Sequence, residues 1–149
     1  MTTIAYHKES GLIAVDTLST RNGVVIDSRS AKFMELKDGS LVLMCGAPAD
    51  YKSFFVAYDG SPTDMQNPDA LAFILRYGKV YRAAVTDGVY WEEEVHSNDA
   101  HGSGADFALA AMDFGKGAKE AVEYAMTRDT KTGGIAIVFD VKTGKVVAQ

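Results

Sequence analysis

Residues 2–16 read TTIAYHKESGLIAVD, and this stretch decides the fold class. The segments Thr3–His7 and Leu12–Asp16 are rich in apolar residues, and the polar stretch Lys8–Gly11 separates them. Two short segments of this kind around a turn that contains glycine are typical of a β-hairpin. We therefore predict that an antiparallel pair of strands opens the fold.

Further hairpins are predicted along the chain. Each consists of two strand-like segments around a turn, and the Asp-Gly pairs in two of these turns favour the positive backbone angles of a tight reversal. The predicted pairs are Lys32–Leu36 with Leu41–Cys45 around Lys37-Asp38-Gly39-Ser40, Lys79–Val85 with Val89–Val95 around Thr86-Asp87-Gly88, and Gly134–Val141 with Lys145–Ala148 around Lys142-Thr143-Gly144. After a polar loop, Val24–Ile26 is expected to add one more short strand.

Helices are expected in two places, in pairs. Aromatic residues recur at helical spacing from about Ala49 to Tyr58. Asn67-Pro68 then provides a helix cap followed by proline, and predicts a second short helix that ends at Gly78. The other pair is Ala105–Phe114 and Ala118–Met126, separated by Gly115-Lys116-Gly117. Hairpins combined with paired helices predict an α+β protein with antiparallel sheets covered by helices.

The composition narrows the classes of function. A chain of 149 residues with 47% apolar residues can form one core, so a single domain over 1–149 is expected. The net charge of -5, with no basic cluster, argues against nucleic acid or a membrane surface as a partner. Apolar runs such as Ile135–Phe139 fall short of the roughly 20 residues of a membrane helix. We expect a soluble, cytoplasmic protein.

Metal and disulfide chemistry are not indicated by the sequence. The one cysteine, Cys45, excludes an internal disulfide and a cysteine-based zinc site, and it is expected to be a buried strand residue rather than a nucleophile. His7, His96 and His101 lack the spacing of a helical metal pair. We expect no metal and no cofactor.

Thr2 directly follows the initiator methionine. Methionine before a small residue is generally removed in cells, so Met1 is expected to be lost and Thr2 to carry a free amine. An α-amino group has an ordinary pKa of about 7.7–8.0, so it can accept the hydroxyl proton of its own residue near neutral pH. Nucleophile and base would then share one residue, although many ordinary chains also begin with Met-Thr.

The residues around Thr2 resemble a known family. Thr2-Thr3-Ile4-Ala5 is similar to the start of the proteasome β subunits and of the bacterial peptidase HslV, in which an aspartate ends the second strand and a lysine on the next strand lies beside the nucleophile. Asp16 and Lys32 match these positions. The resemblance implies that the Lys32 ammonium favours the alkoxide of Thr2 and that Asp16 orients Lys32. Without it, the two would be read as a solvated ion pair.

Four more residues extend the resemblance. Leu43–Asp50 is similar to the strand-to-helix junction of the family, which makes the Gly46 amide a candidate donor to the oxyanion, although it could equally belong to a simple turn before a helix. Ser103, in Gly-Ser-Gly, and Asp129 with Thr132 match motifs that complete the network around the Thr2 amine. Taken alone, Ser103 would be read as a helix cap and Thr132 as a turn residue.

The resemblance implies a fold, a reaction and partners. The fold would be a four-layer αββα sandwich, and the reaction would be peptide-bond hydrolysis by an N-terminal-nucleophile threonine peptidase. Protein or peptide substrates, a homo-oligomeric ring and an ATP-dependent unfoldase are the implied partners. By register, Ser19, Ser30, Met34 and Asp50 are expected to line the substrate groove. Two alternatives stay open, a noncatalytic scaffold subunit of this fold and a small-molecule amidase with the same chemistry.

Overall fold

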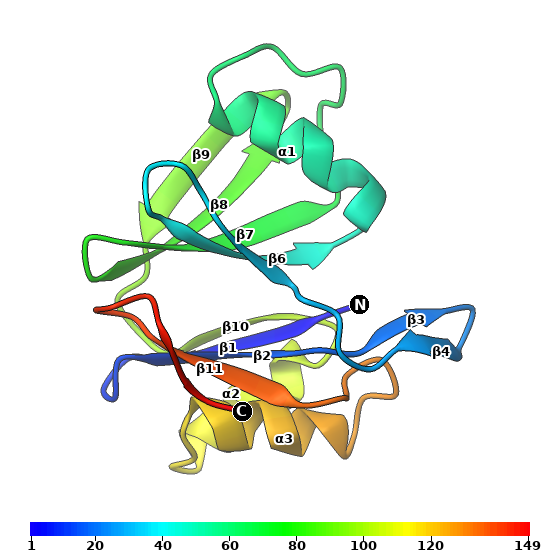
Figure 1. The fold of residues 1–149 in the computed structure, drawn as a ribbon, viewed down its shortest axis with the longest axis vertical. Helices are drawn as coiled ribbons and strands as arrows, with labels where there is room; N and C mark the ends of the chain where they lie inside the picture. Colours follow the sequence, from blue (N-terminus) through cyan, green and yellow to red (C-terminus); the bar gives the residue numbers. More distant parts are fainter.

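The computed structural model describes residues 1–149 and contains two five-stranded antiparallel sheets, a separate two-stranded ribbon and three α-helices (Figure 1). The protein is thus of mixed α and β structure, as the sequence predicted. None of its helices has the length and apolar character needed to cross a bilayer.

The first sheet carries the N-terminal hairpin at its centre. Its strands, in the order β10-β1-β2-β11-β12, are β10 (Asp99–Gly102), β1 (Thr3–His7), β2 (Leu12–Asp16), β11 (Ala136–Asp140) and β12 (Val146–Ala148). The predicted hairpins β1–β2 and β11–β12 are confirmed. The sequence did not predict β10, which pairs with β1 so that Thr3 lies opposite Gly102.

The second sheet has its strands in chain order. These are β5 (Phe33–Glu35), β6 (Leu41–Gly46), β7 (Ala70–Arg76), β8 (Lys79–Thr86) and β9 (Val89–Glu94). The hairpins β5–β6 and β8–β9 are confirmed. Lys32, which was expected to begin a strand, lies one residue before β5.

The helix predicted from Asn67 to Gly78 is wrong, because this segment forms β7 at the centre of the second sheet. Both faces of β7 are buried: Phe73 and Leu75 face the first sheet, whereas Ala72 and Ile74 face a helix. A strand buried on both faces is a continuous apolar run without alternation, and periodicity alone cannot distinguish such a run from a buried helix.

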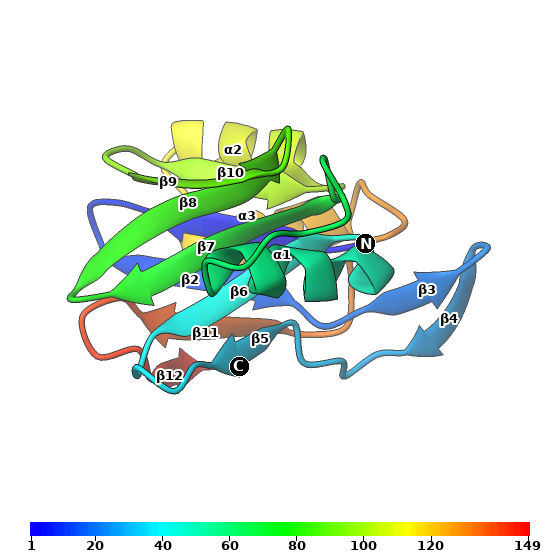
Figure 2. The same ribbon diagram turned by 90° about the horizontal axis from the view of Figure 1, so that it is seen from above.

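The β3–β4 ribbon projects beyond the two sheets (Figure 2). It consists of β3 (Ser19–Arg21) and β4 (Val24–Asp27), which pair only with each other. Asn22 and Gly23 form the turn with φ angles of 51° and 77°. Only a short strand at Val24–Ile26 had been predicted. The missed signal was Asn-Gly, whose two residues tolerate the positive φ angles that a two-residue hairpin turn requires.

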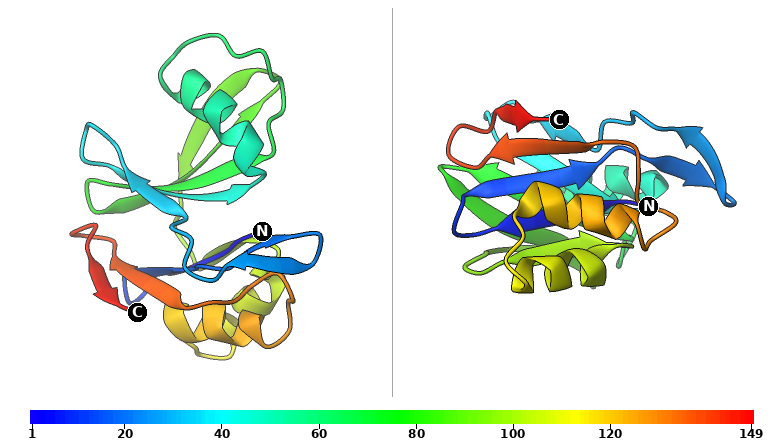
Figure 3. Two further views of the ribbon diagram at one scale, coloured as in Figure 1. Left: turned by 45° about the vertical axis from the view of Figure 1, so that its right-hand side comes forward. Right: turned by 90° about the horizontal axis from the view of Figure 1, so that it is seen from below.

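The helices cover the outer faces of the two sheets. The 3-10 turn η1 (Pro48–Asp50) leads into α1 (Tyr51–Tyr58), which lies on the second sheet, and α2 (Ala105–Asp113) and α3 (Ala118–Met126) lie together on the first (Figures 1 and 3). The predicted helices at Ala49–Tyr58, Ala105–Phe114 and Ala118–Met126 are therefore confirmed to within a few residues at their ends.

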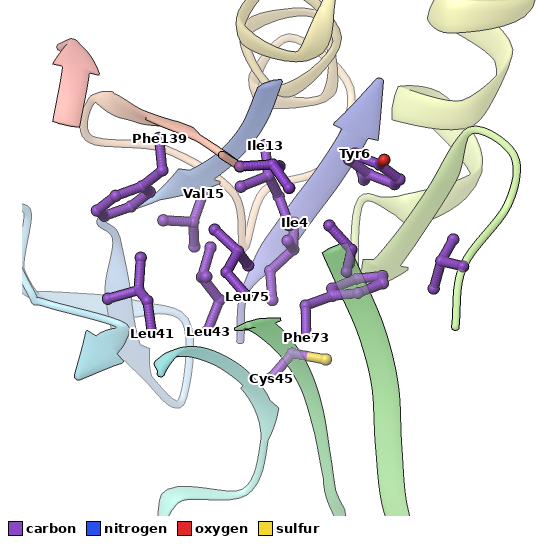
Figure 4. Close-up of a cluster of buried hydrophobic side chains, with 13 residues drawn as sticks. Ile4, Tyr6, Ile13, Val15, Leu41, Leu43, Cys45, Phe73, Leu75 and Phe139 are labelled. Atoms are coloured by element: carbon purple, nitrogen blue, oxygen red, sulfur yellow. The ribbon is translucent and has the colours of Figure 1, made fainter. Parts of the chain in front are cut away.

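Three layers of buried side chains hold these elements together. Between the sheets, side chains such as Ile4 and Val15 of the first sheet point toward Leu43 and Leu75 of the second (Figure 4). The layer beneath α1 contains the fully buried ring of Phe54. The layer beneath α2 and α3 is mostly alanine, with Ala5, Ala14, Ala100, Ala108, Ala111, Ala118, Ala121, Ala125 and Ala136 among its members.

Candidate active site

Thr2 lies directly before β1. The last residue of β2, Asp16, and the last residue of β10, Gly102, lie at the same end of the first sheet. Thr2 is 4% exposed. Its carbonyl oxygen accepts a hydrogen bond of 2.9 Å from the backbone N–H of Ser103. This contact requires glycine at position 102, where φ is +103° and an added Cβ would lie 1.6 Å from the Thr2 oxygen. The N-terminal segment is thereby fixed against the end of β10.

Asp16 and Lys32 form a buried ion pair beside Thr2. The two side chains are 0% and 8% exposed, and Lys32 Nζ lies 2.9 Å from Asp16 Oδ1. The same Oδ1 accepts a 2.9 Å hydrogen bond from the Thr3 N–H, and Oδ2 accepts one of 3.0 Å from the Gly133 N–H. The interpretation as a solvated ion pair is therefore wrong. Asp16 connects β2, β1 and the segment before β11.

Lys32 also reaches the peptide bond before Thr2. Its Nζ donates a 2.6 Å hydrogen bond to the carbonyl oxygen of Met1. Burial lowers the pKa of Lys32, and the neighbouring Asp16 carboxylate opposes this shift. Burial, and then the positive charge of Lys32, lower the pKa of the Met1 amine below its ordinary value of 8.0. The site thus favours a neutral amine close to a lysine.

Ser103, Asp129 and Thr132 come together in one hydrogen-bonded cluster. Asp129 Oδ2 accepts hydrogen bonds from Ser103 Oγ at 2.6 Å and from Thr132 Oγ1 at 2.5 Å. Burial raises the pKa of Asp129, but these two hydrogen bonds, a third from the Lys131 backbone N–H and the positive charge of Lys131 outweigh it, so that the pKa lies below its ordinary value. The predicted proximity of the three residues is therefore present.

The cluster bonds to Thr3 rather than to the Thr2 side chain. Thr132 Oγ1 lies 2.6 Å from Thr3 Oγ1, which in turn accepts a 2.9 Å hydrogen bond from the Gly104 N–H. An ionised carboxylate only accepts hydrogen bonds, so Thr132 donates to Asp129 and Thr3 must donate to Thr132. Thr3 is fully buried, and sequence reasoning had given it no role. The only available signal was a second hydroxyl residue on the buried first strand.

A cavity of about 360 Å³ opens beside Thr2. Its lining includes Lys32 and Gly46 as well as the apolar Met44, Tyr51 and Phe55. Gly46 ends β6 with a φ of +121°, and an added Cβ would lie 2.2 Å from the carbonyl oxygen of Asp69. Glycine is thus required where the backbone of the second sheet borders the cavity.

The groove residues expected by register divide into two groups. Ser19, Ser30 and Met34 line the cavity. Asp50 does not, because its Oδ2 accepts a 2.8 Å hydrogen bond from the Asp69 N–H. Cys45, next to Gly46, faces the core between the sheets, and burial raises the pKa of its thiol to about 12. A thiol in that state is a poor nucleophile.

The structure contains no group of three or more His, Cys, Asp or Glu side chains that could hold a metal ion. The chemistry available at the site is that of hydroxyl groups, one buried ammonium, one buried and one partly buried carboxylate, and backbone amides. Together these can activate a hydroxyl nucleophile and stabilise a developing oxyanion.

Comparison with solved structures identifies the fold. No protein-family model and no curated protein sequence matches the chain significantly. Among solved structures, BPH from Thiobacillus denitrificans in complex with epoxomicin is 19% identical with a TM-score of 0.68, over 93% of this chain and 97% of that one. Eukaryotic HslV from Trypanosoma brucei is 18% identical with a TM-score of 0.70, over 91% and 97%. The chain therefore has the same fold as BPH and HslV.

Proposed function

We propose that the protein is a threonine-type peptidase whose nucleophile is the hydroxyl of Thr2 once Met1 has been removed. The observation that carries the proposal is the position of the buried Lys32–Asp16 pair, which lies beside Thr2 at the edge of a cavity of about 360 Å³. The similarity in fold to HslV supports the same assignment. No cofactor is needed for this chemistry.

The proposed reaction begins with Thr2. Its Oγ attacks the carbonyl carbon of the substrate, and its α-amine takes the hydroxyl proton. The Gly46 N–H is assigned to the oxyanion of the tetrahedral intermediate. The amine then returns the proton to the leaving nitrogen as the C–N bond breaks, which leaves an ester on Thr2. Water then attacks this ester while the Thr2 amine takes a proton from the water. The amine returns this proton to Thr2 Oγ as the ester C–O bond breaks, which restores the free hydroxyl.

The neighbouring residues have supporting roles. The Lys32 ammonium favours the alkoxide form of Thr2 and keeps the Thr2 amine neutral, and Asp16 holds Lys32 in place. Ser103, Asp129 and Thr132 fix β1 through Thr3 and the Thr2 carbonyl, so we assign them to positioning of the nucleophile. Their hydrogen bonds, of 2.5–2.9 Å, support this assignment.

We describe the fold as a single-domain four-layer αββα sandwich, which is supported by the order of α1, the two sheets and the α2–α3 pair (Figure 1). We propose protein or peptide substrates, a homo-oligomeric ring and delivery of substrates by an ATP-dependent unfoldase. The similarity in fold to HslV supports these three points.

A mass measurement tests the proposal. The intact mass is recorded before and after treatment with epoxomicin, a peptide epoxyketone that bonds both the hydroxyl and the free amine of an N-terminal threonine. We expect loss of Met1 and a single adduct that is absent from Thr2→Ala. A processed chain that forms no adduct with several peptide epoxyketones would instead favour the noncatalytic scaffold. Hydrolysis of N-acyl amino acids without hydrolysis of peptides would favour the amidase.

A further inference from the structure

A second hollow adjoins the cavity beside Thr2. It has a volume of about 290 Å³ and lies between the end of β6, the start of β7 and the end of β10, which contribute Gly46, Ala70 and Gly102 to its lining. Gly46 and Met1 line both this second hollow and the larger cavity, whereas Thr2 lines only the larger cavity. The two spaces therefore meet at the proposed donor to the oxyanion.

The proposed reaction assigns one side of the substrate to each space. The acyl part stays bonded to Thr2 Oγ as an ester, so it must lie in the larger cavity, which Thr2 itself lines. The leaving part takes a proton from the Thr2 amine and then departs. Met1 is attached to this amine in the unprocessed chain and borders the second hollow, so its removal opens the hollow to the leaving nitrogen.

Asp69 is the one charged side chain in the lining of the second hollow. It is exposed, and its carboxylate takes part in none of the hydrogen bonds or ion pairs of the structure. Its charge acts on the neighbouring wall: burial is the main cause of the raised pKa of Cys45, and the Asp69 carboxylate adds to this shift. The second hollow thus carries a negative charge that no lysine or arginine of the chain compensates.

The backbone holds Asp69 in a fixed position relative to Gly46. The Asp69 N–H donates a 2.8 Å hydrogen bond to Asp50 Oδ2, and the Asp69 carbonyl oxygen accepts one of 2.8 Å from the Ala47 N–H. The same carbonyl oxygen lies so close to Gly46 that any side chain at that position would collide with it. The Asp69 carboxylate is therefore attached to a rigid part of the site, directly beside the proposed donor to the oxyanion.

The rest of the lining suits the stem of a long basic side chain. Ala70, Leu71 and Ala84 give the second hollow an apolar wall. A lysine or arginine side chain can lay its methylene groups along such a wall and keep its charged end in water. A glutamate in the same place would bring a second negative charge close to Asp69, which is unfavourable.

We propose that the second hollow binds the leaving side of the substrate, and that Asp69 makes lysine or arginine the preferred residue directly after the cleaved bond. This inference rests on the proposed function and specifies the substrates within it. Asp69 would contact the substrate away from the bond that breaks. A reagent that occupies only the acyl side should therefore react independently of Asp69.

Three internally quenched peptides test the preference. They share every residue except the one directly after the cleaved bond, which is lysine, glutamine or glutamate, and mass spectrometry identifies the bond that is cut. At neutral pH we expect kcat/KM to be about 3-fold higher for lysine than for glutamine and about 3-fold lower for glutamate, because an exposed pair of charges contributes a modest free energy. Equal values for the three peptides would overturn the proposal.

Matched variants identify the carboxylate responsible. Asp69→Asn removes the charge and keeps the backbone hydrogen bonds, whereas Asp64→Asn removes the same charge from an exposed residue of the same loop, outside the second hollow. We expect the preference for lysine to be lost in Asp69→Asn and kept in Asp64→Asn. In the unmodified protein it should also shrink in about 1 M NaCl, where the screening length falls to about 3 Å. A preference that survives in Asp69→Asn, or that does not respond to salt, would show that Asp69 is not its source.

The rate of epoxomicin adduct formation separates this inference from the proposed function. A peptide epoxyketone carries no residue after its reactive group, so the unmodified protein and both variants should react at the same rate. A slower reaction of Asp69→Asn would mean that Asp69 supports the site itself, and would overturn its role in specificity. A protein that forms the adduct but cleaves the three peptides equally would refute the role of Asp69 and leave the peptidase standing. A protein that forms no adduct and cleaves no peptide would refute the peptidase and, with it, the assignment of the second hollow.

Discussion

The hydroxyl groups of Thr3 and Thr132 lie 2.6 Å apart, and the proton between them belongs to Thr3. This follows because Thr132 gives its own proton to Asp129. The bond joins the first strand to the segment before β11, and it lies one residue from the proposed nucleophile.

Removal of the Thr132 hydroxyl should weaken both stability and reactivity. In Thr132→Val the Thr3 hydroxyl loses its acceptor and Asp129 loses a donor, which we expect to lower the free energy of unfolding by about 2 kcal/mol. Thr132→Ser keeps the hydroxyl and should form the epoxomicin adduct at the unmodified rate. Urea unfolding and adduct kinetics measure the two effects. Equal adduct rates in the valine and serine variants would show that the hydroxyl has no positioning role.

Removal of the Lys32 ammonium should lower both the stability of the fold and the reactivity of Thr2, and a second substitution should restore only the stability. Lys32→Met leaves the buried Asp16 carboxylate without its counter-charge, at a cost of about 3–5 kcal/mol. The double variant Lys32→Met with Asp16→Asn has no unpaired buried charge and should recover much of this stability. Neither variant should regain reactivity, and we expect adduct formation to fall by roughly 100-fold or more in both. A double variant that reacts at the unmodified rate would show that Lys32 serves stability alone.

The pH dependence of reactivity should reflect a lowered amine pKa. Burial and the Lys32 charge lower the pKa of the Met1 amine, and the Thr2 amine of the processed chain would lie in the same surroundings. A lower pKa means a larger neutral fraction at a given pH, so adduct formation should rise with pH to a midpoint below the ordinary range of about 7.7–8.0. A midpoint within or above that range in a pH–rate profile would contradict the proposed environment.

Acid should destabilise the protein partly through Asp129. Its pKa is lower in the folded protein than its ordinary value of 3.8, so the unfolded chain binds protons more readily as the pH falls. The stabilisation is therefore complete above the ordinary pKa and is lost as the pH decreases through the folded value. Urea unfolding between neutral pH and pH 3 should show a smaller loss of stability for Asp129→Asn than for the unmodified protein. An equal loss would mean that other carboxyl groups account for the acid sensitivity.

Alanine at Gly46 should disturb the site, whereas alanine at Gly39 should not. Both glycines have positive φ, but a Cβ at residue 39 has no atom within 4 Å, and one at residue 46 would lie 2.2 Å from Asp69 O. Gly39→Ala should cost about 1 kcal/mol from backbone strain alone. Gly46→Ala should cost more and also slow adduct formation. Similar values for the two variants would exclude a special role for the tight junction at Gly46.

Local signals were sufficient to predict most of the strands. The β1–β2 hairpin was predictable because Leu12–Asp16 follows its partner after a short polar turn, so the two strands need no distant information to pair. β7 was mistaken for a helix because both its faces are buried, which removes the alternation that identifies a strand. β10 is held by pairing with β1, almost a hundred residues earlier in the chain, and its own residues carry no strong strand signal.

The candidate site was predictable only as a set of residues. The resemblance named Asp16 and Lys32, and the structure brings them within 2.9 Å of each other. It could not show that the hydroxyl groups around Asp129 bond to the Thr3 side chain instead of the Thr2 side chain, because that depends on the distance between β1 and the segment before β11. Ser19 and Ser30, in contrast, were expected by register to line the groove, and both line the cavity.

The alanine layer under α2 and α3 has a mechanical consequence. Alanine has no side-chain rotamers, so this mostly alanine contact can adjust less by rearranging side chains than a layer of leucine or methionine could. The α2–α3 pair and the first sheet should therefore move as one rigid body. A force applied at the α2–α3 turn would be carried through Ala5 and Ala14 along β1 and β2 to the end where Thr2 lies, with little of the displacement absorbed on the way.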